Sequence, residues 1–371
     1  MSEKLHVASQ GTGTPFSYDI VITEGFRELE TLLEPILKDD NSLKHVKKAA
    51  LISDSNVYSL YGQEIKELLN GMGVRICSFV FPAGEESKTL DTVQDVYEFL
   101  IKERFERRDI CLALGGGVVG DLTGFAAATY LRGISFVQIP TSLLAQTDSS
   151  IGGKTGVDFR GFKNMVGAFH QPLLCYMNMS TLDTLDRRQF LSGLGEIIKA
   201  ALIKDHAFYE WLKLNFDGIN TLDKKILKEM IYRACEIKRD VVVNDPMEKG
   251  ERALLNFGHT IGHAVEKSSG FSLFHGECVV LGMIAALYIS MKRGCITETE
   301  YAEACDLFKR FGYTTKIRGL SKEEILDTIR SDKKAEAGIV KFILLEGPGN
   351  AVIKKDVTRE EMEEGLSVIT E

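Results

Sequence analysis

Short apolar runs typical of buried strands alternate with helix-like patterns through the first half of the chain. Expected strands lie at residues 49–52, 74–80, 110–114, 136–139 and 173–176, and expected helices at 56–70 and 87–104. Strands that alternate with helices favour a parallel sheet, because the crossover helices then cover both of its faces. The first half of the sequence therefore predicts an α/β domain.

The pattern changes near residue 180, beyond which long helical patterns dominate. Expected helices lie at residues 187–204, 224–242, 256–268 and 276–292, and a short hairpin strand at 339–345. Gly270 and Gly294 stand where glycines commonly end helices. We therefore expect an α/β nucleotide-binding domain over residues 1–180 and a mostly α-helical domain over residues 181–371, with the active site between them.

The composition excludes several classes of function. The net charge of -8 argues against general nucleic-acid binding. The N-terminus has no apolar signal core, and the longest apolar stretch, residues 278–289, is shorter than the about 20 residues that span a bilayer. The seven cysteines include no CxxC pair and lie mostly among aliphatic residues. We expect reduced thiols in a cytoplasmic protein without a membrane or nucleic-acid partner.

A glycine-rich phrase, Gly115-Gly-Gly-Val-Val-Gly120-Asp121, follows an expected strand and opens an expected helix. Glycines at such a point let the backbone approach a pyrophosphate, and the helix N-terminus supplies N–H donors. The phrase lacks the usual GxGxxG spacing. It indicates either a dinucleotide site or a tight turn with only a structural role.

A second polar phrase runs from Pro140 to Gly156 and contains Asp148 and Lys154 among hydroxyls and glycines. We expect it to form one loop, which could bind sugar hydroxyls and phosphate together, with the lysine as a point charge. Lys163 and Asn164 continue its polar character. The alternative is a flexible surface loop.

Three of the seven histidines, His259, His263 and His275, fall close together among glycines. The first two are spaced i,i+4, so both could face one side of a helix and bind one metal ion. Alternatively, one of them binds the metal and the other relays protons. Glu196 is a carboxylate on an otherwise apolar helix face, where a cation would be a suitable partner.

Cationic and amide side chains are found near these groups in the sequence, at Lys199, Lys238, Arg252 and Asn256. Individually, such residues are usually solvated. Around a metal ion they could hold an anionic substrate. The set does not identify the reaction.

Several long motifs together resemble the 3-dehydroquinate synthase family of sugar phosphate cyclases. The resemblance runs from about Asp54 to about Leu345. Its motifs are Pro82-Ala-Gly-Glu85-Glu-Ser-Lys88-Thr, Gly115-Gly-Gly-Val-Val-Gly-Asp121, Tyr130-Leu-Arg132-Gly, Asp148-Ser-Ser-Ile-Gly-Gly-Lys154-Thr, Phe162-Lys163-Asn164, Gly195-Glu196-Ile-Ile-Lys199 and Leu255-Asn256-Phe-Gly-His259-Thr-Ile-Gly-His263.

This resemblance implies a shikimate-pathway lyase that serves chorismate and aromatic amino acid biosynthesis. Such an enzyme turns 3-deoxy-D-arabino-heptulosonate 7-phosphate into 3-dehydroquinate and phosphate. It uses transient oxidation by NAD, β-elimination, reduction and an intramolecular aldol closure, and it requires zinc or cobalt. The alternatives are a 2-deoxy-scyllo-inosose or 2-epi-5-epi-valiolone synthase, an iron-type alcohol or glycerol phosphate dehydrogenase, and an inactive homologue that serves as a scaffold.

The resemblance also assigns roles to residues. The metal ligands would be Glu196, His259 and His275. The NAD-binding residues would be Asp54, Asn56, Glu85, Lys88, Gly116, Gly117, Asp121, Thr141, Ser142, Asp148, Ser149, Lys163, Thr184 and Leu185. The substrate-binding residues would be Arg132, Lys154, Asn164, Lys199, Lys238, Arg252, Asn256, His263, and Lys333 or Lys334. Among these, the expected catalytic residues are His263, Lys154, Lys238, Asn256 and Arg252, and Arg132 would reach the neighbouring subunit of a homodimer.

Overall fold

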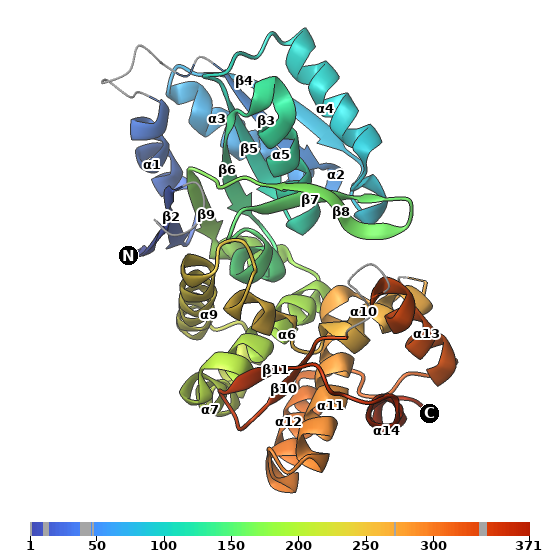
Figure 1. The fold of residues 1–371 in the computed structure, drawn as a ribbon. Coiled ribbons are helices and arrows are strands. Elements are labelled where there is room, and N and C mark those ends of the chain that lie inside the picture. Colours follow the sequence, from blue (N-terminus) through green and yellow to red (C-terminus); the bar gives the residue numbers. More distant parts are fainter. Residues whose placement is uncertain (1, 10–14, 38–45, 47, 271, 334–339) are drawn as a thin grey trace. The chain divides into compact units, whose positions relative to one another are not determined.

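The computed structural model describes residues 2–9, 15–37, 46, 48–270, 272–333 and 340–371 (Figure 1). The chain divides into two compact units. The first comprises Met1–Leu185 with Lys238–Met247, and the second comprises Asp186–Ile237 with Glu248–Glu371. The boundary expected near residue 180 lies within the 3-10 helix Met179–Thr184. The sequence did not indicate that residues 238–247 return to the first unit.

A seven-stranded sheet forms the centre of the first unit. Its strands, in spatial order, are β1 (Glu3–Ser9), β2 (Phe16–Thr23), β9 (Leu174–Asn178), β6 (Ser135–Pro140), β5 (Ile110–Gly115), β3 (Lys48–Asp54) and β4 (Arg75–Phe81). All neighbouring pairs from β2 to β4 are parallel, whereas β1 pairs with β2 in antiparallel register. The parallel sheet expected from the sequence is confirmed, with an antiparallel edge strand added.

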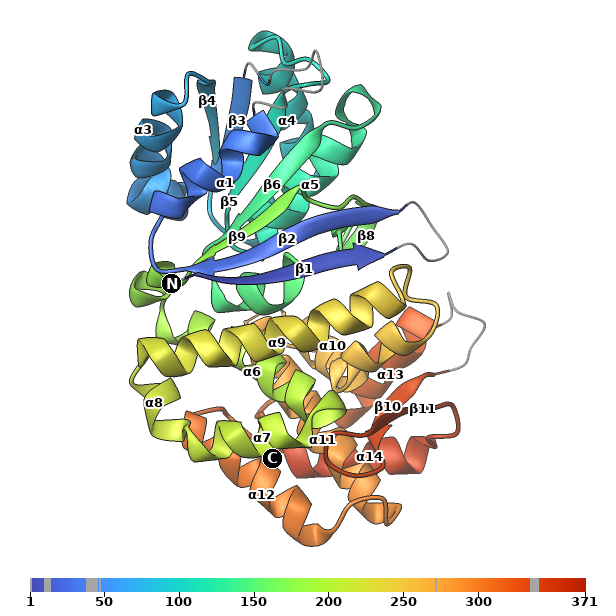
Figure 2. The same ribbon diagram turned by 90° about the vertical axis from the view of Figure 1, so that its left-hand side faces the viewer.

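Helices cover both faces of this sheet (Figure 2). On one face, α1 (Arg27–Leu37) and α3 (Gln63–Gly71) pack against Leu51 of β3. On the other face, α4 (Leu90–Lys102) and α5 (Gly117–Thr129) pack against Ile52, the next residue of the same strand. Successive side chains of a strand point to opposite faces, so each strand contributes to both cores.

The expectation that residues 140–156 form one loop was wrong. Residues Ala145–Ser149 form a helical turn, and Lys154 begins a strand, β7 (Lys154–Phe159), which pairs with β8 (Phe162–Phe169) in an antiparallel hairpin. Val157 of β7 is fully buried in the core that includes α5. The many hydroxyls and glycines of this stretch conceal the alternating pattern by which a strand is usually predicted.

Helices dominate the second unit. They are α6 (Arg187–Lys204), α7 (His206–Leu214), α8 (Phe216–Asn220), α9 (Lys224–Asn244), α10 (His259–Ser268), α11 (His275–Lys292), α12 (Glu298–Phe311), α13 (Lys322–Lys333) and α14 (Arg359–Ile369). The last residues of α9 belong to the first unit. A small hairpin of β10 (Phe342–Leu345) and β11 (Ala351–Lys354) confirms the expected strand near residue 345. Among the described helices, none is both long and apolar enough to cross a membrane.

Close backbone contacts bring together the three helices that carry the histidines and Glu196. Helix α11 is buried almost throughout its first three turns and packs on α6 and α10. A Cβ atom at Gly276 would lie 2.1 Å from the Ser192 carbonyl oxygen of α6, and one at Gly282 would lie 1.9 Å from the Gly258 carbonyl oxygen before α10. Only glycine permits such contacts, which hold the start of α11 against α6 and the start of α10 against α11.

Candidate functional site

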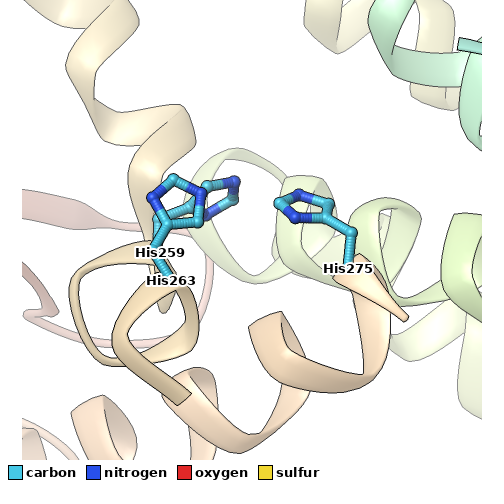
Figure 3. Close-up of side chains that lie close together, drawn as sticks. All are labelled: His259, His263 and His275. Carbon is cyan, nitrogen blue, oxygen red and sulfur yellow. The ribbon is translucent and has the colours of Figure 1, made fainter. Parts of the chain in front are cut away.

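Three imidazoles converge at the N-terminal ends of two helices in the second unit. His259 is the first residue of α10, His263 lies one turn later, and His275 is the first residue of α11. Their rings point toward one another (Figure 3), and one nitrogen of each lies within 4.8 Å of those of the other two. The i,i+4 spacing therefore does place His259 and His263 on one side of a helix.

Glu196 of α6 completes this cluster. Its Oε1 lies 3.4 Å from Nε2 of His275 and 3.8 Å from Nε2 of His259. Two ligand atoms about 2.1 Å from a tetrahedral zinc ion are separated by roughly 3.4 Å, so these separations suit a shared ion. The side chain is 2% exposed, and Oε1 accepts no hydrogen bond from the described residues. A buried carboxylate oxygen in this state is a suitable ligand for a cation.

The charges around Glu196 favour its ionised form. Burial would raise the pKa of this carboxyl, but the Lys199 ammonium, which pairs with Oε2, and the imidazoles of His275 and His259 hold it well below its usual range. Burial and the charge of Lys199 lower the pKa of His259 well below the usual range for histidine. Burial also opposes charge on His275, yet the carboxylates of Glu196 and Glu266 raise its pKa to about 9. A carboxylate thus lies beside each nitrogen of the His275 ring, and at the nitrogen that faces Glu196 a proton and a metal ion are alternative partners.

Two more of the expected substrate residues belong to the short helix that leads into α10. Arg252 and Asn256 lie in the 3-10 helix Glu251–Asn256, where Arg252 is 2% exposed. The Asn256 Nδ2 atom donates a hydrogen bond to Glu248 Oε1 at 3.0 Å. Sequence reasoning had overlooked Glu248, because a charged residue in a loop between two helices is usually only solvated.

A second polar cluster lies in the first unit, around Lys88. This lysine is buried, and its Nζ donates to Asp121 Oδ2 at 2.7 Å and to Asn164 Oδ1 at 2.5 Å. Burial would lower the pKa of Lys88, but Asp121 and Glu85 raise it, whereas burial raises the pKa of Asp121 against the effect of the lysine. Two expected cofactor residues and one expected substrate residue are thus in direct contact.

Other expected cofactor residues lie at the carboxyl ends of the parallel strands. At the end of β3, Asp54 Oδ1 accepts from the backbone N–H of Asn56 at 2.9 Å. At the end of β5, a Cβ atom at Gly117 would lie 3.2 Å from Ser149 Oγ. After β6, Ser142 Oγ accepts from the backbone N–H of residue 145 at 3.2 Å. This edge of a doubly wound sheet is where nucleotides bind, with phosphate near a helix N-terminus.

The remaining expected residues of the first unit lie around this edge. Lys163 Nζ is 3.6 Å from Glu85 Oε1, and Lys238, in the part of α9 that belongs to this unit, pairs with Asp148. The Thr184 hydroxyl forms a hydrogen bond with the Tyr61 hydroxyl. Gly116 lies at the start of α5, and Thr141 follows β6 directly. Leu185 is the last residue of the segment Met1–Leu185.

Some expected substrate residues are not placed beside either cluster by a described contact. Arg132 and Lys154 are exposed, and Arg132 has a left-handed backbone with φ of 68°. Lys333 is the last residue of α13, and Lys334 lies outside the described residues. The roles of these four positions, like those of the other expected site residues, remain predictions.

Comparison with known proteins covers both units. The family model described as 3-dehydroquinate synthase N-terminal matches residues 78–192, and the one described as 3-dehydroquinate synthase C-terminal matches residues 193–335. The chain is 43% identical over 328 residues to a 3-dehydroquinate synthase of Acetivibrio thermocellus, covering 88% of this chain and 89% of that protein.

Solved structures with the same fold include two cyclases. A 2-epi-5-epi-valiolone synthase from Streptomyces hygroscopicus subsp. jinggangensis, with NAD+ and Zn2+ bound, has a TM-score of 0.86 at 29% identity and covers 96% of this chain and 98% of its own. A 2-deoxy-scyllo-inosose synthase complexed with carbaglucose-6-phosphate, NAD+ and Co2+ has a TM-score of 0.85 at 25% identity, with 98% and 99% covered. The expected fold class is thereby confirmed.

Proposed function

The chain belongs to the 3-dehydroquinate synthase family, and we propose that it converts 3-deoxy-D-arabino-heptulosonate 7-phosphate into 3-dehydroquinate and inorganic phosphate. The observation that carries this proposal is the buried Glu196 oxygen that faces Nε2 of both His259 and His275. Relatives that are 41–43% identical to this chain are named 3-dehydroquinate synthase, and Glu196, His259 and His275 would supply the donors for the metal-dependent step.

Glu196, His259 and His275 would hold a divalent metal, zinc or cobalt. When bound, such an ion polarises neighbouring hydroxyl oxygens of the sugar, so that a hydroxyl proton is lost more easily. Lys199 keeps Glu196 ionised and therefore able to act as a ligand. His263, which shares a helix face with His259, is left to bind substrate or to carry a proton on its imidazole nitrogen.

The polar edge of the parallel sheet would bind NAD. When bound, NAD accepts a hydride from the substrate and later returns it, so no net reduction results. Lys88 holds Asp121 and Asn164 in fixed positions through two hydrogen bonds. Glycines at the start of α5 leave its N-terminal N–H groups accessible to a pyrophosphate.

The cationic side chains would hold the two anionic ends of the substrate. Lysine and arginine form charge-assisted hydrogen bonds with phosphate and carboxylate, and several of them together fix one conformer of a flexible sugar. Phosphate held in this way is able to take the proton that must leave before elimination, so no strong protein base is needed. The residues proposed for this binding are Lys154, Asn164, Lys199, Lys238, Arg252, Asn256, His263 and Lys333 or Lys334.

The function is tested by incubating the metal-loaded protein with NAD and the heptulosonate phosphate. We expect release of phosphate, formation of a six-membered carbocycle and no net absorbance at the NADH band. Hydrolysis without ring formation, or no turnover with metal and NAD present, would contradict the proposal. Steady accumulation of NADH would instead indicate a dehydrogenase.

The sister cyclases are the nearest alternative, because two of them share the fold closely. They are less similar in sequence, at 29% and 25% identity, than the relatives named 3-dehydroquinate synthase. A parallel assay with a sugar phosphate that lacks the carboxylate separates the two possibilities. Turnover of that compound and not of the heptulosonate phosphate would favour a sister cyclase.

We further propose a homodimer in which Arg132 reaches the phosphate site of the neighbouring subunit. Its support is a set of exposed apolar side chains on the same unit, since Leu131 is 39% exposed and the β8 residues Met165 and Phe169 are 60% and 45% exposed. Exposed apolar side chains often mark an interface where they gather into one patch. A cytoplasmic location is also proposed, supported by the seven free cysteines, of which five are buried.

A further inference from the structure

Glu266 is a buried acid on the same face of α10 as the two histidines of that helix. Positions 259, 263 and 266 follow the i, i+4, i+7 spacing of one helix face. The Glu266 side chain is 4% exposed. A carboxylate in so enclosed a place costs free energy unless polar or cationic groups compensate for its lost hydration.

The Glu266 carboxylate lies against the outer nitrogen of the His275 ring. Its Oε2 is 3.5 Å from His275 Nδ1, while Nε2 of the same ring is 3.4 Å from Glu196 Oε1. A carboxylate therefore faces each of the two ring nitrogens. A proton on Nδ1, directed to Glu266, would leave the Nε2 lone pair for a metal ion.

His259 shows the same arrangement with a different acceptor. Its Nδ1 lies 3.2 Å from the Phe257 carbonyl oxygen, and its Nε2 lies 3.8 Å from Glu196 Oε1. Both imidazoles thus present Nε2 to one carboxylate oxygen and Nδ1 to an outer acceptor. For His259 this acceptor is a backbone carbonyl, whereas for His275 it is a side chain that a single substitution can change.

We propose that Glu266 is a positioning residue of the metal centre, which fixes the tautomer and ring orientation of His275 so that Nε2 faces Glu196. The inference rests on the proposed function, because it takes Glu196, His259 and His275 as the metal ligands. A carboxylate can only accept a hydrogen bond, so it selects one tautomer of the imidazole. An amide at position 266 can donate or accept, so it would not enforce that choice.

The experiment measures metal binding directly in Glu266→Gln and Glu266→Asp. Zinc affinity is determined by competition with a chromophoric chelator, and the ligand geometry by the visible absorption of the cobalt-loaded protein. We expect Glu266→Gln to weaken zinc binding about 10- to 100-fold, the range typical for the loss of an outer partner of a ligand. Its cobalt spectrum should also shift, while Glu266→Asp, which keeps the charge, should recover part of the affinity.

Glu277→Gln is the matched control, since it also removes a carboxylate from the start of α11. Glu277 Oε2 accepts from the backbone N–H of Phe274 at 2.8 Å, and Oε1 accepts from Arg188 Nε at 2.7 Å. These contacts cap the helix and contain no ring nitrogen of His275. We expect this variant to lower the unfolding temperature of the metal-free protein while its zinc affinity stays close to that of the unmodified chain.

The outcomes separate this inference from the proposed function. If Glu196→Gln binds zinc as tightly as the unmodified chain, the proposed ligand set is wrong. The proposed function and the positioning role of Glu266 then both fail. If Glu196→Gln loses zinc but Glu266→Gln does not, or if Glu277→Gln loses as much as Glu266→Gln, only the positioning role is overturned. If Glu266→Gln does not fold, Glu266→Asp still tests the positioning role, because its shorter side chain withdraws the carboxylate from Nδ1. A cobalt spectrum in Glu266→Asp identical to that of the unmodified chain would overturn that role.

Discussion

At the scale of single residues, substitutions of Glu196 and His263 should distinguish metal binding from later steps of the reaction. Glu196→Gln removes the anionic oxygen that faces two imidazole nitrogens, so we expect zinc binding to weaken by more than the about 100-fold that loss of an outer partner causes. His263→Asn should retain zinc and lose turnover. Chelator competition measures the first effect and phosphate release the second. Loss of zinc in His263→Asn would instead make that imidazole a ligand.

Lys88 should contribute to stability through the carboxylate that it neutralises. Lys88→Met leaves the half-buried carboxylate of Asp121 without this cation, and because breaking a fully buried pair on one side costs about 3–5 kcal/mol, we expect a loss of about 3 kcal/mol or less of unfolding free energy. The pKa of Asp121 is already raised in the folded chain and would rise further, so the folded state would bind more protons than the unfolded state. The unfolding free energy of the variant should therefore fall as pH rises, and urea unfolding at pH 5 and pH 7 should show a smaller loss at pH 5.

Two companion variants test this explanation. Lys102→Met removes an exposed lysine, 70% exposed and paired with Glu98, and should change the unfolding free energy by about 0.5 kcal/mol or less. Adding Asp121→Asn to Lys88→Met should restore much of the lost stability, because no charge is then left unpaired. A loss in Lys88→Met that does not vary with pH would point to lost packing instead.

Residue-level prediction from the sequence succeeded where spacing along one helix carries the information. His259 and His263 can be placed on one side because i,i+4 positions are neighbours on any helix. Spacing cannot say that Glu196, on another helix, comes within 3.4 Å of His275, since that distance depends on how α6 packs on α11. No role was assigned to Glu266, although its i+7 position from His259, on the helix face that carries both histidines, was a usable signal.

At the scale of helices, the contact between α10 and α11 should be essential to the cluster. In Gly282→Ala the added Cβ would lie 1.9 Å from the Gly258 carbonyl oxygen, so α10 must shift away from α11. We expect a loss of about 1–3 kcal/mol or more in unfolding free energy, together with weaker zinc binding, because α10 carries His259. Gly71→Ala is the control: its Cβ would meet nothing within 4 Å, and it should stabilise the protein slightly. Unchanged zinc binding in Gly282→Ala would show that the helix contact does not set the ligand geometry.

Helices and strands differ in how far the sequence reveals them. Helix α6 was predicted over the residues it occupies, because a long helical pattern covers them, and in the structure the Asp186 side chain caps its start. Strands β7 and β8 were not predicted, since glycines and hydroxyls interrupt their pattern and several apolar side chains of β8 are exposed. The hairpin also packs on α5, which lies earlier in the chain, and the local pattern of β7 and β8 carries no signal for that contact.

At the scale of the whole molecule, the sequence predicts two domains but not how one helix is shared between them. The alternation of strands and helices identifies the first, and long helical patterns identify the second. Helix α9 reads as one uninterrupted pattern, yet its residues from Lys238 onward belong to the first unit. These residues belong to the first unit because of tertiary contacts such as the Lys238–Asp148 pair. The periodic pattern of a helix does not indicate such contacts.

The proposed dimer should reveal itself through complementation between two inactive variants. Arg132→Ala lacks the phosphate contact and Glu196→Gln lacks the metal ligand, so each alone should be inactive. If Arg132 acts on the neighbouring subunit, a mixed dimer has one site with both residues intact. Random pairing in a two-fold dimer should then restore roughly a quarter of the unmodified activity. The two variants are refolded together and assayed for phosphate release.

Two controls decide how the result is read. A mixture of Arg132→Ala with the double variant Arg132→Ala/Glu196→Gln should stay inactive, because no subunit then supplies the arginine. Differently tagged subunits, co-purified through one tag, establish that mixed dimers have formed. Mixed dimers without recovered activity would mean that Arg132 acts within its own subunit or not at all. If the protein in solution is a single species of monomeric mass, the exposed apolar side chains of β8 are not a dimer interface. The proposed homodimer would then be wrong.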